Sequence, residues 1–318
     1  RPISPKKGNK WSKADLYLIP SEENMFSRSK GILEVDILKD KSVAIIGLGS
    51  FGSTIAVELV KAGVGVFHLY DFDTVELHNL ARHTATVHDL GRLKTDVMEE
   101  AILGKNPYAE VHKHEVNISI QPEALADVVE DIDLIVCATD NNRSRFVLSG
   151  LAYQHDKPCI YGRAFTRAEG GDVFIQRPGE ACYCCLVGNQ WFNPADEEIT
   201  NEASARRDGT IPAYTSPEDA GAMVQVGLSS DILPICNMMV KLALVELSRG
   251  RESGISALED ELVYNYYMWA NRRERKFGNW RPFNDAGHMP TILRWYGAQI
   301  PRNEECAICS DSAELIID

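Results

Sequence analysis

A glycine-rich turn between an apolar run and a helical pattern constrains the fold of this sequence most strongly. The run SVAIIG (residues 42–47) is short, apolar and β-branched, which is typical of a strand buried in a parallel sheet. GSTIAVELVKAG (residues 52–63) has apolar residues at helical spacing, and Gly63 is its expected C-cap. The turn between them follows the pattern G-x-G-x-x-G, with Gly47, Gly49 and Gly52. We expect a phosphate to bind here, at the helix N-terminus, although a tight turn without a ligand has the same pattern.

Strand and helix patterns continue to alternate along the chain. We expect strands at VFHLYDF, DLIVCATD and PCIYGRA, and a helix at TDVMEEAILGKN that ends at Asn106 and Pro107. This alternation predicts an α/β fold with a doubly wound, Rossmann-like, mainly parallel sheet. Ligands of such sheets lie beyond the carboxyl ends of the strands, which is where Gly47, Asp71 and Asp140 fall.

The texture of the sequence divides the chain into three parts. Residues 1–39 form a polar N-terminal arm, residues 40–181 the Rossmann-like core, and residues 182–318 a C-terminal portion of the same domain. In the last part, residues 191–219 predict a long irregular connection, and DILPICNMMVKLALVELSRG predicts a helix in the core or at a subunit interface. The tail alternates short apolar runs (ELVYNYYMW, TILRWYGAQIP) with turns, and we expect it to form an antiparallel crossover extension.

Composition argues against several classes of function. A net charge of −13 and a pI near 5.1 disfavour a general nucleic-acid or lipid-surface binder, which would carry a basic excess. No run approaches the ~18 apolar residues of a membrane span, and the N-terminus lacks the apolar core of a signal peptide. We therefore expect a cytoplasmic protein with no membrane or nucleic-acid partner.

Two smaller features concern the chain as a whole. The basic run RRERK (residues 272–276) predicts a solvated loop or a contact with an acidic protein. The chain starts without Met, so we expect a processed product or part of a longer protein.

The stretch DFDTVELHNLAR (residues 71–82) follows the second expected strand. Asp71 lies about twenty residues after the turn, where an acid binds ribose hydroxyls in NAD and ATP enzymes alike. An enzyme that cleaves a nucleoside triphosphate also needs cations and a metal ion against the charge of the pyrophosphate. Candidates are two cations, a neutral donor and an acid at a neighbouring strand end: Arg82, Lys94, Asn79 and Asp140. Taken singly, the cations could be surface charges, and Asp140 could be only the N-cap of the next helix.

Four of the eight cysteines form two Cys-x-x-Cys pairs that lie far apart in the sequence. Cys182 with Cys185, and Cys306 with Cys309, could together close a tetrahedral zinc site of the structural type. A redox dithiol is the alternative, but neither pair lies where a thioredoxin motif would. Such pairs favour a reducing compartment over a disulfide framework.

Several motifs in sequence order, IIGLGSFG, DFDTVELHNLARH, LGRLK, CATDN, CYCCL and CAIC, resemble the adenylating superfamily of ThiF and MoeB proteins, which includes the ubiquitin-activating enzymes. The resemblance runs from about Phe26 to Cys309 and implies ATP and Mg²⁺ as cofactors. It implies that Asp71 binds the ribose, that Asp140 binds Mg²⁺, and that the phosphates are held by Asn79, Arg82 and Lys94. It also implies a homodimer in which Arg28 enters the partner subunit's site, and a structural zinc ion on Cys182, Cys185, Cys306 and Cys309.

The reaction implied by this resemblance is attack of a protein's C-terminal carboxylate on the α-phosphate of ATP, giving an acyl-adenylate and pyrophosphate. The carboxylate is already a nucleophile, so orientation and charge stabilisation can suffice. The implied acceptor is a small ubiquitin-like or sulfur-carrier protein. The arm, RRDGTIPAYTSPEDAG and ILRWYGAQIPR resemble bacterial relatives from ubiquitination-like or antiviral operons, which implies a partnered or fused conjugating-enzyme-like module.

The sequence departs from those relatives that pass the adenylate on to a thiol. No cysteine lies between Leu186 and Ile235, where such enzymes carry one. Cys184 is the one remaining cysteine that we expect to be exposed, because the others lie in apolar runs typical of a core: Cys137, Cys159 and Cys236. A smaller departure is His83, which stands where relatives often have Gln.

Three alternative functions follow from these features. The missing loop cysteine suits adenylation of a peptide or a small acid without a thioester step. A catalytically inactive scaffold could bind a ubiquitin-like partner, but it would not need the full set of ATP residues. An NAD oxidoreductase explains the glycines and Asp71, but leaves Lys94, Asp140 and the cysteine pairs without a role.

Overall fold

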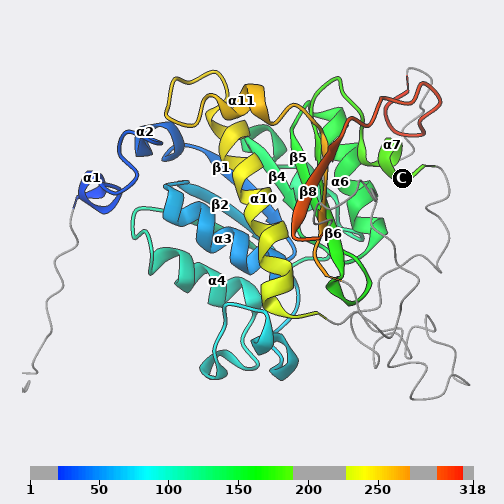
Figure 1. The fold of residues 1–318 in the computed structure, drawn as a ribbon. Coiled ribbons are helices and arrows are strands. Elements are labelled where there is room, and N and C mark those ends of the chain that lie inside the picture. The colour runs from blue at the N-terminus through cyan, green and yellow to red at the C-terminus, as the bar shows by residue number, and fades with distance from the viewer. Residues whose placement is uncertain (1–20, 189–226, 273–291, 311–318) are drawn as a thin grey trace, which may run out of the picture.

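The computed structural model describes residues 21–188, 227–272 and 292–310 (Figure 1). Within these ranges the strands form one sheet in the order β3-β2-β1-β4-β5-β6-β7-β8. The first five strands of this order pair in parallel, and the last three continue the sheet in antiparallel pairs. The expected mainly parallel sheet with an antiparallel C-terminal extension is therefore confirmed. In chain order the strands are β1 (Ser42–Ile46), β2 (Val66–Tyr70), β3 (Glu110–His114), β4 (Leu134–Cys137), β5 (Cys159–Ala164), β6 (Gly170–Gln176), β7 (Tyr266–Ala270) and β8 (Arg294–Ala298).

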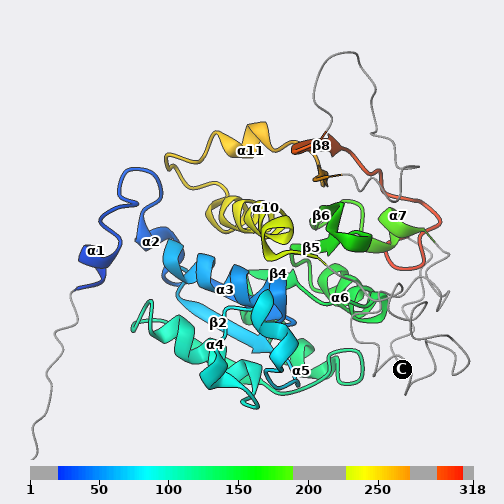
Figure 2. The ribbon, with the colours of Figure 1, turned by 60° about the horizontal axis from the view of Figure 1, so that its bottom comes forward.

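Helices cover both faces of this sheet. One face is covered by α3 (Ser50–Ala62), α4 (Lys94–Leu103) and α10 (Ser229–Ser248), and the other by α5 (Glu123–Ala126), α6 (Asn142–Gln154) and α7 (Tyr183–Val187). Figure 2 shows α10 lying beside α3. Leu242 of α10 is fully buried in the same apolar cluster as Leu59 of α3. We expected this apolar helix in the core or at a subunit interface, and the structure places it in the core.

Most of the expected elements are present, and two strands were not expected. The helix after the glycine turn ends at Gly63, whose φ of +106° is the left-handed C-cap conformation. β3 has the sequence EVHKH and lies at the edge of the sheet, where charged side chains are tolerated. Its residues therefore lack the apolar pattern that predicts a buried strand. β6 begins with two glycines, which weaken a strand pattern. The expected connection at 191–219 and most of the RRERK run lie outside the described residues.

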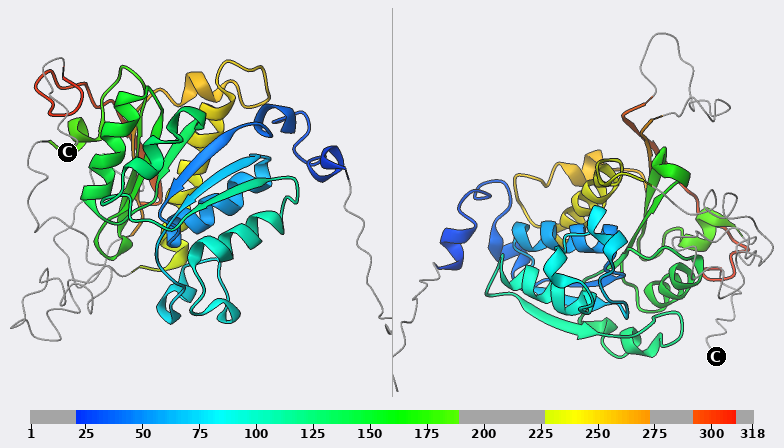
Figure 3. Two further views of the ribbon diagram at one scale, coloured as in Figure 1. Left: turned by 180° about the vertical axis from the view of Figure 1, so that it is seen from behind. Right: turned by 90° about the horizontal axis from the view of Figure 1, so that it is seen from below.

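The described part of the N-terminal arm (residues 21–39) and the candidate site lie at opposite ends of the sheet. α2 (Val35–Leu38) ends shortly before β1 begins, so it lies at the amino end of that strand, and α1 (Glu22–Met25) lies farther out (Figure 3). The glycine turn follows the carboxyl end of the same strand. The remaining short elements are η1 (Leu77–Ala81), η2 (Val87–Asp89), η3 (Val129–Asp131), η4 (Thr166–Ala168) and α11 (Leu258–Glu261). None of the described helices has the length and apolar character that crossing a membrane requires.

Three histidines gather at the edge of the sheet formed by β2 and β3. The ring of His68 stacks on those of His112 and His114, with centroids 4.5 and 5.4 Å away. His68 Nδ1 and His114 Nε2 are 3.2 Å apart, a hydrogen-bond distance. Burial, and then the neighbouring His112 and His114, lower the pKa of His68 from 6.5 to about 4, while Asp131 opposes this shift. His68 is therefore neutral in the folded protein at neutral pH.

We expect His68 to make the fold less stable in mild acid. The unfolded chain takes up a proton at His68 near pH 6.5, whereas the folded chain resists protonation down to about pH 4. The free energy of unfolding therefore falls as pH falls through this window, by about 1–3 kcal/mol from this group. Urea denaturation from about pH 7 to pH 4.5 should give a shallower pH dependence for His68→Gln than for the wild type. His88→Gln, at an exposed histidine, is the control, and a slope for His68→Gln equal to the wild type would contradict this expectation.

Candidate functional site

The glycine turn brings α3 against the end of β1 more closely than any side chain would allow. A Cβ atom at Gly52 would lie 1.8 Å from the carbonyl oxygen of Gly47. Gly47 itself has φ of +88°, and a Cβ atom there would lie 2.9 Å from the carbonyl oxygen of Ala138. A Cβ atom at Gly49 would meet nothing within 4 Å among the described residues. Gly47 and Gly52 are thus required by the protein's own packing, whereas Gly49 keeps the approach to the N-terminus of α3 open.

Asp71 ties the end of β2 to this turn. Its Oδ2 accepts a hydrogen bond from the backbone N–H of Leu48 at 2.7 Å, and its Oδ1 accepts one from that of Asp73 at 2.9 Å. Lys94 Nζ lies 3.8 Å from Asp71 Oδ1. Burial raises the pKa of the Asp71 carboxyl, which Lys94 and the two N–H donors oppose. Each carboxylate oxygen has a second lone pair, which can accept a ribose hydroxyl.

Lys94 is a buried cation and not a surface charge. Its side chain is only 9% exposed, and Nζ donates a hydrogen bond to Asp73 Oδ2 at 2.9 Å. The segment before α4 is pinned beside the end of β2, because Lys94 N donates to Asp73 O and Thr74 forms a bridge with Leu93. The ammonium group is therefore held at the Asp71 carboxylate, next to the glycine turn.

Asn79 and Arg82 lie on the loop between β2 and α4, at η1. The Oδ1 atom of Asn79 accepts a hydrogen bond from Glu76 N at 2.9 Å, so its amide nitrogen is the part that can donate to a ligand. Arg82 is half-buried and follows η1, with its backbone N–H bonded to Asn79 O. The residue after Arg82 contacts the glycine turn directly, so this loop lies at the site.

His83 is a site residue that the sequence marked only as a departure from relatives. Its Nε2 is 2.7 Å from Leu48 O, and its Nδ1 accepts a hydrogen bond from Ala85 N at 2.8 Å, so Nε2 carries the proton. Burial lowers the pKa of His83, which favours this neutral form. Leu48 in the middle of the turn is thereby held by Asp71 through its N–H and by His83 through its carbonyl. A pattern search could not find this role, because a side chain to backbone contact across 35 residues leaves no sequence signal.

Asp140 lies in the turn between β4 and α6, beside the glycine turn. β4 pairs with β1, with Cys137 opposite Ile46, so Ala138 is a neighbour of Gly47. Asp140 is exposed. The N-cap of α6 is Asn141, whose Oδ1 accepts a hydrogen bond from Ser144 N at 2.9 Å. Asp140 is therefore not the N-cap, and it follows the carboxyl end of β4, the end of the sheet at which ligands of such folds bind.

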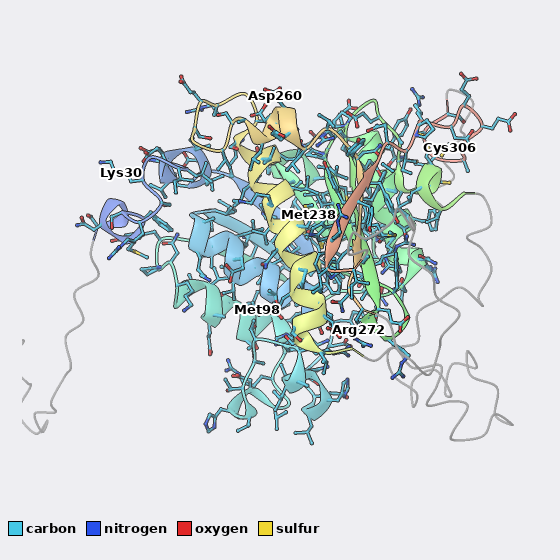
Figure 4. All side chains as sticks on the ribbon, in the orientation of Figure 1. Lys30, Met98, Met238, Asp260, Arg272 and Cys306 are labelled. Carbon is cyan, nitrogen blue, oxygen red and sulfur yellow. The ribbon has the colours of Figure 1, made fainter. Side chains whose placement is uncertain are left out.

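Arg28 does not lie near the site of its own chain. It is exposed and follows α1, and the nearby Phe26 and Val35 pack at Gly63, the C-terminal end of α3. The glycine turn is at the other end of this helix, about 20 Å away along its axis. Figure 4 shows the neighbouring Lys30 on the same outlying segment.

The four paired cysteines converge in space. The Sγ atoms of Cys182, Cys185, Cys306 and Cys309 all lie within 4.8 Å of one another. Three of the Sγ–Sγ distances are 3.4, 3.4 and 3.8 Å, near the ~3.8 Å edge of a tetrahedron with zinc–sulfur bonds of about 2.3 Å. The backbone N–H groups of Asn303 and Ile308 donate to sulfurs of the cluster. The donor set fits a structural zinc ion, and Figure 4 shows Cys306 beside α7.

The expectation that Cys184 is exposed is wrong. Its side chain is buried with 1% exposure, in the apolar cluster that also contains Cys306 and Ile308. The turn of α7 directs this side chain into the core while the flanking cysteines meet their partners. Cys137, Cys159 and Cys236 are buried as expected, and burial raises the pKa of the Cys236 thiol to about 12. Burial of Cys184 makes it unsuitable for accepting an acyl group in this conformation.

Gly49 and Gly52, at the start of α3, should respond differently to an added methyl group. We expect Gly52→Ala to lower the free energy of unfolding by about 3 kcal/mol or more, because the methyl group collides with the Gly47 carbonyl. Gly49→Ala should keep the fold but weaken ATP binding about tenfold or more, because the methyl group blocks the approach of a phosphate. Urea denaturation and calorimetric titration with ATP measure the two effects. Wild-type ATP affinity in Gly49→Ala would show that the turn does not hold a phosphate.

Known proteins that resemble this chain identify its family. A model of the ThiF family matches residues 23–258. The molybdopterin-synthase adenylyltransferase of Escherichia coli K12 is 37% identical over 155 residues, which cover 48% of this chain and 60% of that protein. Ubiquitin-like modifier-activating enzyme 5 of Oryza sativa subsp. japonica is 28% identical over 228 residues, which cover 65% of this chain and 53% of that protein. The chain thus spans little more than half the length of these relatives.

Solved structures give the same fold. The crystal structure of Escherichia coli MccB with ATP matches 87% of this chain and 68% of MccB with a TM-score of 0.60, at 18% sequence identity. At this identity the similarity concerns the fold alone. The family model, in contrast, matches well over half of the chain, and the protein belongs to the ThiF family.

Proposed function

We propose that this protein uses ATP to adenylate the C-terminal carboxylate of a small ubiquitin-like or sulfur-carrier protein. The observation that carries this proposal is the buried Lys94 beside Asp71 at the glycine turn. A dinucleotide-binding turn needs the acid but not a buried cation beside it, whereas a triphosphate that loses pyrophosphate needs positive charge there. The relatives named molybdopterin-synthase adenylyltransferase and ubiquitin-like modifier-activating enzyme 5 support the same class of reaction.

In this reaction a carboxylate oxygen attacks the α-phosphorus, the new oxygen–phosphorus bond forms, and the bond to the bridging oxygen of pyrophosphate breaks. Asp71 orients the ribose, and the N-terminus of α3 receives a phosphate. Lys94, Arg82 and the amide of Asn79 stabilise the negative charge that moves onto the pyrophosphate. Asp140 would hold Mg²⁺, which neutralises charge on the phosphates. No group of the chain has to remove a proton, because the attacking carboxylate is already ionised.

Adenylation of a peptide or a small acid is the second candidate. It is favoured by the lack of any cysteine between Leu186 and Ile235 and by the burial of Cys184, since a thioester step needs an accessible thiol. The fold similarity to MccB, a microcin C7 biosynthetic enzyme, is compatible with this candidate. A conjugating-enzyme-like partner or fused domain belongs to the first candidate only. Both candidates fit a reducing, cytoplasmic setting and the division at residues 39 and 181.

Incorporation of labelled pyrophosphate into ATP tests the reaction. Exchange should require Mg²⁺ and an acceptor, for which a small protein ending in Gly-Gly encoded beside this gene is the first choice. Asp140→Ala should lower the exchange rate about 100-fold or more with an unchanged melting temperature. Asp260→Ala, at an exposed acid on α11, is the matched control and should exchange like the wild type. Absence of exchange with every protein and peptide acceptor would favour an inactive scaffold.

We also propose a homodimer in which Arg28 completes the partner's site. Its position at the far end of α3 supports this, because it cannot reach the nucleotide of its own chain. Arg28→Ala and Asp140→Ala chains, each inactive alone, should regain about a quarter of the wild-type exchange rate when unfolded and refolded together. This value follows because half of the dimers are mixed and each mixed dimer has one intact site. No recovery, with mixed dimers present by mass spectrometry, would remove Arg28 from the partner's site.

A further inference from the structure

Tyr183 connects the four-cysteine cluster with the turn that carries Asp140. It lies in α7, directly after Cys182, and its side chain is fully buried. The hydroxyl group donates a hydrogen bond to Asn142 Oδ1 at 3.2 Å. Asn142 is the first residue of α6 and stands two positions after Asp140. One side chain therefore spans from the cysteine cluster to the edge of the nucleotide site.

Asn142, which accepts the hydrogen bond from Tyr183, is part of a network that fixes the turn bearing Asp140. Arg145 is buried with 2% exposure, and its Nη1 donates to the same Asn142 Oδ1 at 3.2 Å. Its Nη2 donates to Thr139 O at 2.8 Å, in the residue that precedes Asp140. The Tyr183 hydroxyl thus acts on an acceptor that also positions Arg145, and Arg145 holds the backbone on the other side of Asp140.

Tyr183 itself, beside Cys182, is held in one position by several contacts. Its backbone N–H lies 3.2 Å from both Ser149 Oγ of α6 and Gln176 Oε1 of β6. Its ring stacks on Tyr161 with centroids 4.7 Å apart, and the Arg163 guanidinium lies 5.9 Å above it. A helix as short as α7 has little stability of its own, so a metal ion bound by Cys182 and Cys185 would add to these contacts in fixing it. The position of the Tyr183 hydroxyl is therefore coupled to metal binding at the cysteines.

We propose that Tyr183 is a positioning residue that couples the closed four-cysteine site to the turn bearing Asp140, and thereby to the binding of ATP with its metal ion. Its action on ATP rests on the proposed function, whereas its action on the turn does not. By linkage the coupling is reciprocal, so ATP with Mg²⁺ also tightens metal binding at the cysteines.

Tyr183→Phe removes only the hydroxyl group and is the central test in the full-length chain. We expect one zinc per chain to be retained, with amide hydrogen exchange raised in the peptide covering residues 138–146. MgATP affinity should fall about three- to tenfold, as the loss of one hydrogen bond implies. Tyr161→Phe is the matched control: its hydroxyl is buried beside the same ring but donates to Gln176, so exchange at 138–146 should stay at the wild-type level.

A second pair of variants separates positioning from general loosening of the fold. Asn142→Ala removes the acceptor of both Tyr183 and Arg145, so it should raise exchange at 138–146 at least as much as Tyr183→Phe. Adding Tyr183→Phe to Asn142→Ala should change little, because the acceptor of the Tyr183 hydroxyl is already gone. Asn142→Asp keeps the acceptor oxygen and should retain wild-type exchange at 138–146. In the wild type, removing zinc with a chelator should raise exchange in this peptide, and in Tyr183→Phe it should add little.

The outcomes are distinct. Unchanged exchange at 138–146 in Tyr183→Phe, or a further rise in exchange when Tyr183→Phe is added to Asn142→Ala, would overturn the coupling. Raised exchange in a protein whose wild type does not bind MgATP would uphold the coupling and overturn the proposed function instead.

Discussion

The close approach of α3 to the end of β1 is the contact on which the rest of the site depends. It exists because Gly47 adopts a left-handed backbone and Gly52 has no side chain to collide with its carbonyl. The backbone of Leu48 is then hydrogen-bonded on both sides, its N–H to the carboxylate of Asp71 and its carbonyl oxygen to the imidazole of His83. These bonds hold the end of β2 and the loop after it beside the turn. Lys94 is placed there too, because its backbone N–H donates a hydrogen bond to the carbonyl oxygen of Asp73.

The elements that form this centre could be predicted from sequence because each has a local pattern. A β-branched apolar run, a helical apolar stripe and a glycine C-cap are signals within a few residues, and the structure has β1, α3 and Gly63 as expected. β3 and β6 could not be predicted, since one is a charged edge strand and the other begins with glycines. Their strand character comes from pairing with neighbours and not from their own residues.

For the site, residue types were predictable but environments were not. Lys94 is buried against the usual tendency of lysine, and only the fold supplies the carboxylates that hold it. Cys184 shows the opposite error, since it was expected to be exposed and is buried. The Cys-x-x-Cys spacing indicates that its neighbours could bind a metal ion, but it says nothing about which face of α7 Cys184 occupies. The convergence of the two cysteine pairs agrees with the expectation from spacing, and the contact from Tyr183 to Asn142 has no counterpart in any motif.

The cysteine cluster also has a consequence for the order in which the chain assembles. Cys182 and Cys306 are 124 positions apart, and the chain between them supplies α10 and the strands β7 and β8. Of the three strands that pair in antiparallel, β7 and β8 lie within this long loop, whereas β6 and all the parallel strands precede Cys182. Closing such a loop costs entropy that a metal clasp offsets. A metal ion on the four cysteines would therefore hold together the two ends of the segment that carries the last strands of the sheet, so the metal would act on the late steps of assembly and not only on the finished fold.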